Sequence, residues 1–249
     1  MSSGESAPTV VRKHFEVGET AVTILAEERF IPLAKESIFR SRETVQRFIA
    51  FDPLFQDTLE PYRLGVEAPP LIRAMCSASA KARVGPMATV AGAIAKEAVR
   101  AMVQAGARQA AVDNGGDIAL FLTDELEVGL YAGTSRIKDV GLKVPGERRE
   151  FGICTSSGTV GPSISFGVAD AAVVLAEDAI LADACATRLG NEVRSGEEED
   201  MLEAIATVLR VSGVEGALVV VGDRMAMRGK VPRLVKVKVP PTAISRIEL

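Results

Sequence analysis

Asp183 and Thr187 stand four residues apart in a small-residue segment, where the chain reads Leu-Ala-Asp-Ala-Cys-Ala-Thr from residue 181. In a helix, side chains four residues apart lie on the same face, so both oxygens can point at one ion. A hard cation such as Mg2+ takes one or two oxygen ligands from the protein and the rest from phosphates and water. The pair therefore indicates half of a metal site, although the solvated edge of an amphipathic helix would give the same pattern.

Two turns could place backbone amides against a phosphate-bearing ligand. The segment 83–89 contains a Gly-Pro turn and leads into a helix, whose N-terminus carries free amides and a partial positive charge. In Asn114-Gly115-Gly116-Asp117, the glycines let the backbone approach a ligand, with Asn114 or Asp117 as the polar contact. Each segment also has an ordinary structural interpretation, a helix cap in the first case and a tight hairpin turn in the second.

A third segment, Thr155-Ser156-Ser157-Gly158, is small and polar and follows a predicted strand. Its hydroxyls and amides are candidate contacts for a phosphate-bearing ligand. The segment lacks the Gly-Lys-Ser/Thr ending of a P-loop, so hydrolysis of a nucleoside triphosphate by that route is not supported. A solvated loop would explain the same residues without any ligand.

Strands and helices must position these residues. We expect Thr89 to cap a helix that ends at Gly106, and the Asp183 helix to end at Gly190. Other predicted elements are strands at 10–15, 21–26, 75–83, 110–112, 118–122, 127–131, 151–154, 171–175, 214–221 and 224–227, helices at 33–51 and 197–210, and a loop at 140–150. This order lacks the strict alternation of a parallel sheet. The predicted class is therefore α+β, with mainly antiparallel strands and packed helices, in one domain over residues 1–249.

Composition disfavours several classes of function. Of the 249 residues 47% are apolar and 25% charged, and the net charge of −4 does not favour nucleic acid. His14 is the only histidine, which argues against Ser-His-Asp hydrolysis and most zinc enzymes. No apolar run is long enough to cross a bilayer, the N-terminus has no secretory signal, and the three cysteines are far apart. We therefore expect a cytoplasmic protein.

Taken together, the segments resemble the ApbE superfamily, whose characterised members are FAD:protein FMN transferases. Residues 92–98 resemble the family's Gly-x-Ile-Ala-Lys-Gly helix, residues 114–117 its Asn-x-Gly-Gly turn, residues 155–158 its Ala-Thr-Ser-Gly segment, and residues 182–187 its Ala-Asp-Ala-Leu-Ala-Thr signature. The resemblance covers roughly residues 75 to 192 and is closest to an uncharacterised ApbE-related branch. Each motif alone is unspecific, but four in the right order are much more specific.

The resemblance implies a T-fold-like, ApbE-type domain that binds FAD with Mg2+. It assigns the metal ligands to Asp183, Thr187 and the carbonyl of Ala93. It makes Asp183 and Lys96 the catalytic residues, with Lys96 as a second positive group near the phosphates. Asn114, Gly115 and Gly116 of the glycine turn, and the segment Thr155-Ser156-Ser157-Gly158, would contact the nucleotide. In the family, Mg2+ stabilises charge while a threonine of a partner protein attacks, so that FMN is attached and AMP is released.

The sequence departs from the family pattern at two places, and both bear on the prediction of flavin transfer. The transferases carry a His-x-x-Asp-Pro-x-Thr-Gly element that residues 162–170 lack, and Glu97 stands where they have a glycine after the lysine. The first hypothesis is a Mg2+-dependent enzyme that acts on a flavin nucleotide, by FMN transfer or by cleavage of the FAD pyrophosphate. The alternative is a non-catalytic protein that binds a flavin or another phosphorylated metabolite, and a third hypothesis is a structural subunit. No nucleic-acid or membrane partner is expected, and the small-residue helix surfaces would suit a homodimer.

Overall fold

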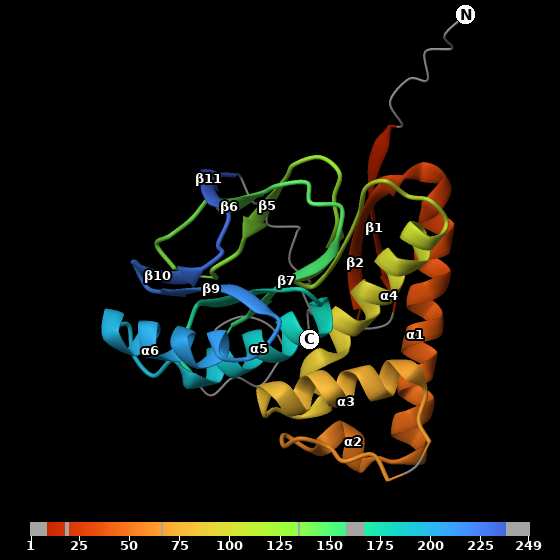
Figure 1. Ribbon diagram of the computed structural model, residues 1–249, viewed down its shortest axis with the longest axis horizontal. Coiled ribbons are helices and arrows are strands. Elements are labelled where there is room, and N and C mark those ends of the chain that lie inside the picture. The colour runs from red at the N-terminus through yellow and green to blue at the C-terminus, as the bar shows by residue number, and fades with distance from the viewer. Residues whose placement is uncertain (1–8, 18–19, 66, 134, 158–166, 238–249) are drawn as a thin grey trace, which may run out of the picture.

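Eight antiparallel strands form the main sheet of the protein (Figure 1). The computed structural model describes residues 9–17, 20–65, 67–133, 135–157 and 167–237. In spatial order the strands are β1 (Val10–Val17), β2 (Thr20–Glu27), β3 (Ala110–Asn114), β4 (Asp117–Phe121), β7 (Glu150–Ser156), β8 (Ala171–Ala176), β9 (Val214–Val221) and β10 (Arg224–Gly229). All neighbouring pairs are antiparallel, so the predicted α+β class with mainly antiparallel strands is confirmed.

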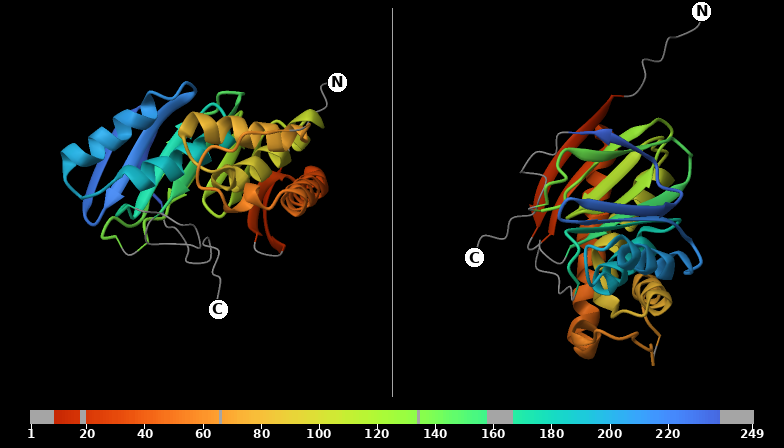
Figure 2. Two further views of the ribbon diagram at one scale, coloured as in Figure 1. Left: turned by 90° about the horizontal axis from the view of Figure 1, so that it is seen from below. Right: turned by 90° about the vertical axis from the view of Figure 1, so that its left-hand side faces the viewer.

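The two faces of the main sheet are covered differently (Figure 2). A second sheet, in the order β11 (Arg233–Lys236), β6 (Val140–Val144) and β5 (Leu126–Leu130), packs on one face through aliphatic side chains such as Leu120, Leu142 and Leu218. Helices cover the other face. They are α1 (Ile31–Phe51), α2 (Leu54–Asp57), α3 (Pro70–Ala82), α4 (Val90–Gln104), α5 (Ala179–Glu192) and α6 (Glu198–Leu209), with short 3-10 helices η1 (Glu28–Phe30) and η2 (Pro86–Thr89).

This layering explains the most apolar stretches of the sequence. Strand β8 lies inside the three layers and is buried along its whole length, which is why it reads as a continuous apolar run rather than an alternating one. Helix α5 is buried from Ala179 to Ala186 because it packs on β7 and β8 and is itself covered by α3, α4 and α6. A helix that is apolar on all sides belongs in a core. The residues of the proposed metal site are therefore carried by one of the most enclosed helices of the fold.

The helical layer holds two apolar clusters. Helices α3, α5 and α6 pack over β7 to β9, whereas α1 and α4 pack over β2 to β4. Small residues of α4, including Ala95 and Ala98, are buried and let its neighbours come close. In the described part of the chain, no helix is both long enough and apolar enough to span a membrane.

Three predictions for individual elements are wrong. Residues 75–83, predicted as a strand, lie almost entirely in α3, whose buried positions Ile72, Met75, Cys76 and Ser79 have helical spacing. The predicted loop 140–150 contains β6, which pairs in the second sheet with the strand near 127–131. Strand β11 was not predicted. β11 pairs with β6 across a long stretch of chain, and local pattern does not report such pairing. The other predicted helices and strands are confirmed to within a few residues.

Candidate functional site

Helices α4 and α5 cross at Gly92, and this crossing positions the proposed site. A Cβ atom at Gly92 would lie 2.4 Å from the carbonyl oxygen of Ala179 and 2.9 Å from the Cβ of Asp183. Only a glycine allows α5 to approach the first turn of α4 this closely. The glycine of the family-like helix motif therefore has a direct physical function, which is to admit the Asp183 carboxylate to the N-terminus of α4.

Asp183 is 7% exposed, and its Oδ2 accepts a hydrogen bond of 2.8 Å from the backbone N–H of Gly92. Burial raises the pKa of Asp183 to about 7, while hydrogen bonds from the amides of Gly92 and Ala91 act in the opposite direction. The first amides of a helix have no partner inside the helix and attract an anion. In this structure that anion is the Asp183 carboxylate, at the helix N-terminus where the sequence had indicated a phosphate.

Thr187 lies one turn after Asp183 on α5 and is half-buried, as the spacing of four residues predicts. Ala93 is fully buried next to Gly92 in the first turn of α4. In the described residues, no three Asp, Glu, His or Cys side chains gather as a metal-binding group. A cation here would depend on the hydroxyl of Thr187, backbone oxygens, phosphate and water beside Asp183. The roles of Asp183, Thr187 and Ala93 as metal ligands stay predictions.

The turn between β3 and β4 lies against the same helix end. Gly115 and Gly116 have φ values of 71° and 101°, so the two-residue loop needs the left-handed conformation at both positions. The side-chain amide of Asn114, which is buried, donates to the carbonyl of Ala91 over 3.1 Å. The backbone N–H of Thr155 donates to the carbonyl of Gly116 over 3.2 Å. The turn is thus held between α4 and the end of β7.

The hydroxyl segment begins beside this turn. Thr155 and Ser156 are the last residues of β7, and Ser156 is buried, while Ser157 follows the strand and is half-buried. Gly158 lies outside the described residues. The structure therefore brings Thr155 next to the Asn114–Gly116 turn, although the two segments are far apart in the sequence. Their roles as ligand contacts stay predictions.

Asp117 lies close enough to Asp183 for their charges to interact, whereas the sequence indicated it only as an alternative to Asn114. Burial raises its pKa well above the usual range, and the negative charges of Asp183 and Asp113 raise it further. Burial also raises the pKa of Asp113, whose Oδ1 accepts a hydrogen bond of 2.9 Å from the Gly116 amide. Two carboxylates from distant segments, Asp117 and Asp183, thus disfavour each other's ionised form. A bound cation would relieve that repulsion.

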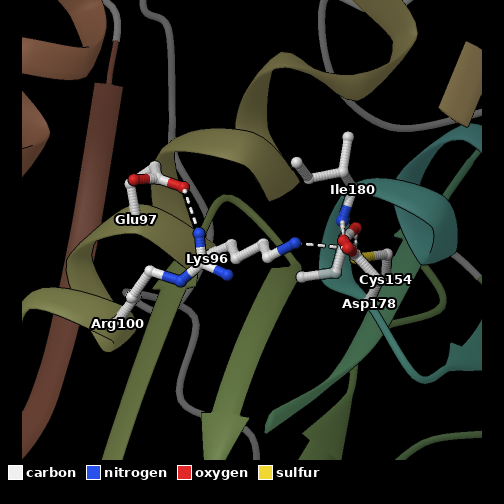
Figure 3. A network of polar contacts seen from close by, with 7 residues as sticks. Lys96, Glu97, Arg100, Cys154, Asp178 and Ile180 are labelled. Carbon is white, nitrogen blue, oxygen red and sulfur yellow. Dashed lines mark hydrogen bonds and ion pairs between the residues drawn. The ribbon is translucent and has the colours of Figure 1, made fainter. Parts of the chain in front are cut away.

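Lys96 contacts a carboxylate at the start of α5, and its catalytic role beside the phosphates stays a prediction. Its ammonium forms an ion pair with Oδ2 of Asp178, and Figure 3 shows the side chain reaching from α4 to the start of α5. Asp178 is the N-cap of α5, with Oδ1 accepting from the backbone N–H of Ile180 at 2.8 Å. This pair was not predicted, because Asp178 precedes the family signature. Lys96 and Asp183 occupy opposite ends of the contact between α4 and α5.

Comparison with known proteins assigns this chain to a protein family. A family model described as "AbpE bacteria" matches residues 4–228. The chain belongs to this ApbE-related family. The resemblance found in the sequence is therefore confirmed, and it extends well beyond residues 75–192 to nearly the whole chain.

UPF0280 proteins are among the relatives of this ApbE-related chain. The UPF0280 protein of Methanocella arvoryzae is 47% identical over 232 residues, which cover 93% of this chain and 94% of that protein. The UPF0280 protein of Methanosarcina acetivorans is 49% identical over 230 residues, covering 92% and 90%. The match runs along the full relatives.

Two solved structures share the fold of the ApbE-related chain. The flavin transferase ApbE from Vibrio cholerae superimposes with a TM-score of 0.53 at 14% identity, covering 89% of this chain and 97% of that one. The apo flavinyl transferase ApbE from Pseudomonas stutzeri gives a TM-score of 0.56 at 10% identity, covering 89% and 94%. At such low identity, these matches establish the ApbE-type fold and do not transfer the activity.

Proposed function

We propose that this chain binds a flavin nucleotide with Mg2+ at the crossing of α4 and α5 and cleaves its pyrophosphate. The observation that carries the proposal is the 2.8 Å contact between Asp183 and the Gly92 amide. It brings Asp183 to the end of α4 that Asn114 also contacts, and the end of β7 bonds to the same turn. The solved ApbE proteins with this fold are flavin transferases, which makes a flavin the first ligand to test.

The residues present fit a hard cation. Asp183 contacts the α4 N-terminus, Asp117 interacts with the Asp183 charge, and Thr187 follows one turn later on α5, so carboxylate and hydroxyl oxygens are available, and oxygen ligands suit Mg2+. The raised pKa values of Asp117 and Asp183 show that their ionised forms are disfavoured, and a bound cation would stabilise those forms. When bound, Mg2+ would supply a positive charge that stabilises the phosphate oxygens while the P–O bond breaks.

The protein's own groups would do the rest of the binding. Asp183 and Thr187, with the carbonyl of Ala93, would hold the cation. The Asn114–Gly116 turn and the hydroxyls of residues 155–157 would orient the phosphates. With an acceptor hydroxyl as nucleophile the products are an FMN ester and AMP, and with water they are FMN and AMP.

Incubation of the full chain with FAD and MgCl2 tests the proposal. We expect equal amounts of AMP and FMN, or AMP and protein-linked FMN, by chromatography and mass spectrometry. Asp183→Asn should lower the rate by about a hundredfold or more, as loss of a group that stabilises transition-state charge does. The matched control is Asp200→Asn on α6, because Asp200 also accepts backbone hydrogen bonds, from Arg194 and Ser195, but lies on another helix.

A second candidate function is non-catalytic flavin binding, and the hydrogen bond of Asp183 and the ion pair of Lys96 favour it. Asp183 serves as a cap for α4, and Lys96 is paired with Asp178, so both are partnered without a ligand. A non-catalytic flavin-binding protein would show tight binding of FAD or FMN, no release of AMP, and unchanged binding in Asp183→Asn. That combination would rule out the enzyme and leave the binding protein.

A further inference from the structure

Lys96 of α4 and Asp178, the N-cap of α5, form a partly buried ion pair, and the proposed reaction explains neither residue. We infer that the two are positioning residues, whose ion pair sets the distance between the helices and thereby holds the Gly92 amide on Asp183. The inference concerns how the proposed site is assembled, so its consequences for ligand binding rest on the proposed function. Its structural consequence can be measured without any ligand.

The first support is that Asp178 makes two contacts that point in different directions. Oδ1 accepts from the N–H of Ile180 at 2.8 Å and so closes the first turn of α5, while Oδ2 binds the Lys96 ammonium from α4. The two side chains are 17% and 32% exposed, so water screens this pair less than it screens an ordinary surface pair. A single carboxylate therefore connects the start of one helix to the middle of the other.

The second support is the spacing of the contacts. Gly92 and Lys96 are four residues apart and lie on the same face of α4, about 6 Å apart along its axis. Gly92 meets Asp183 and Ala179, and Lys96 meets Asp178. The helices are thus joined at two points one turn apart on α4. Two such contacts fix both the separation and the rotation of α5 relative to α4.

The third support is the lack of free space around Ala179. A Cβ at Gly92 would lie 2.4 Å from the Ala179 carbonyl oxygen, and one at Gly152 of β7 would lie 2.3 Å from the Ala179 Cα. The start of α5 is therefore enclosed between α4 and the sheet. Because a hydrogen bond weakens steeply with distance, a small displacement at Asp178 is enough to loosen the bond between Gly92 and Asp183.

A neighbouring pair on α4 serves as the contrast. Nη1 of Arg100 lies 3.6 Å from Oε1 of Glu97, and both residues belong to α4 (Figure 3). Their side chains are 46% and 33% exposed. This pair cannot connect α4 to α5, because both of its members lie on α4. It therefore offers matched control variants, Arg100→Met for Lys96→Met and Glu97→Gln for Asp178→Asn.

Amide hydrogen exchange of the ligand-free full chain tests the inference directly. We expect the Gly92 N–H to exchange roughly tenfold faster in Lys96→Met, in Asp178→Asn and in the double variant, which is the effect of losing about one hydrogen bond. The double variant should exchange no faster than either single one, and Lys96→Arg should restore protection. Arg100→Met and Glu97→Gln should behave as wild type.

The exchange of a distant amide separates local opening from general destabilisation. The N–H of Asp170, which donates to the Val220 carbonyl over 2.9 Å, should keep its wild-type rate in all variants. The inference is overturned if Gly92 keeps its protection in Lys96→Met. It is also overturned if Gly92 and Asp170 lose protection together, because the pair then contributes only to global stability.

Binding of Mn2+ as a paramagnetic probe links the inference to the proposed site. Lys96→Met and Asp178→Asn should weaken Mn2+ binding by the same factor. The double variant should bind Mn2+ as tightly as either single variant. If Lys96 instead contacted a phosphate of the ligand, Lys96→Met would weaken FAD binding while Asp178→Asn would not, and the positioning role would be refuted. If wild type binds neither Mn2+ nor FAD, the proposed function fails, while the exchange of Gly92 still decides the positioning role.

Discussion

At the scale of single residues, Asp183 combines two tasks that compete for the same oxygens. Its carboxylate caps the N-terminus of α4, and the same group is the proposed ligand of a cation. The cap alone does not compensate for burial, as the raised pKa shows. The folded protein is more stable when the Asp183 carboxyl is protonated or when a cation lies beside it. Both effects can be measured as changes in unfolding free energy.

The pH dependence of stability should therefore carry the signature of Asp183. Its pKa rises from about 4 in the unfolded chain to about 7 in the folded protein, so the folded state holds the proton more tightly. The stabilisation is complete below pH 4 and is lost as pH rises to about 7. Urea unfolding without Mg2+ should show a loss of up to about 4 kcal/mol between these limits. Asp183→Asn should flatten this slope, and an unchanged slope would contradict the shift.

Gly92→Ala tests the close approach of the helices. The added Cβ would meet the Ala179 carbonyl at 2.4 Å, a backbone atom that cannot turn aside. We expect the free energy of unfolding to fall by about 2–4 kcal/mol, in the range of overpacked core positions. Gly65→Ala is the control because a Cβ there meets nothing within 4 Å. Equal stability of the two variants in urea would show that the crossing can relax.

Sequence reasoning could propose Asp183, Thr187 and the Asn114 turn as site residues, because each has a local pattern, and their functional roles stay predictions. It missed Asp178, whose significance depends on Lys96, 82 residues earlier in the chain. It assigned Lys96 to the phosphates by resemblance to the family, and that role stays a prediction. Contacts between distant segments are the part of a site that one sequence does not report.

At the scale of elements, the same limit separates the correct predictions from the wrong ones. Helix α1 and the hairpin of β9 and β10 have clear periodicity and turns, and both were found. Residues 75–83 alternate small and larger side chains over a short window, which mimics a strand, whereas the whole of α3 shows helical spacing. Strand β6 was missed since its glycine and lysine resemble a loop and since it belongs, with β5, to a small sheet apart from the main one.

Gly116→Ala tests the turn between β3 and β4 as an element. The φ of 101° is strained for any residue with a side chain, yet a Cβ there would meet no atom closer than 3.9 Å. A loss of about 1–2 kcal/mol in unfolding free energy is therefore expected from conformation alone. A loss of stability as small as that of Gly65→Ala would mean that the turn adapts at no cost.

At the scale of the whole molecule, the three layers place the most buried helix between the sheet and the other helices. Helix α5 cannot move without disturbing β7, β8 and three neighbouring helices. A cation bound to Asp183 would therefore stabilise the entire fold rather than one loop. The stabilisation follows from mass action, since the unfolded chain has no such site.

Thermal unfolding with and without Mg2+ measures this coupling. At a Mg2+ concentration near a hundred times its dissociation constant, stability should rise by about 2.7 kcal/mol. Removing the metal with EDTA should reverse the rise. Asp183→Asn should abolish it, whereas Asp200→Asn should retain it. A rise of the same size in Asp183→Asn would place the cation elsewhere.

Strand order also bears on how the chain reaches its native state. β2 and β3 are neighbours in the main sheet, yet the 82 residues from 28 to 109 separate them, including α1 to α4. Closing a loop of that length costs about 4 kcal/mol in chain entropy before the strands can pair. The N-terminal hairpin is thus expected to dock late, onto a β3 already supported by α4. Until then β3 is an uncovered edge, and a nascent chain is most exposed to misassembly at that stage.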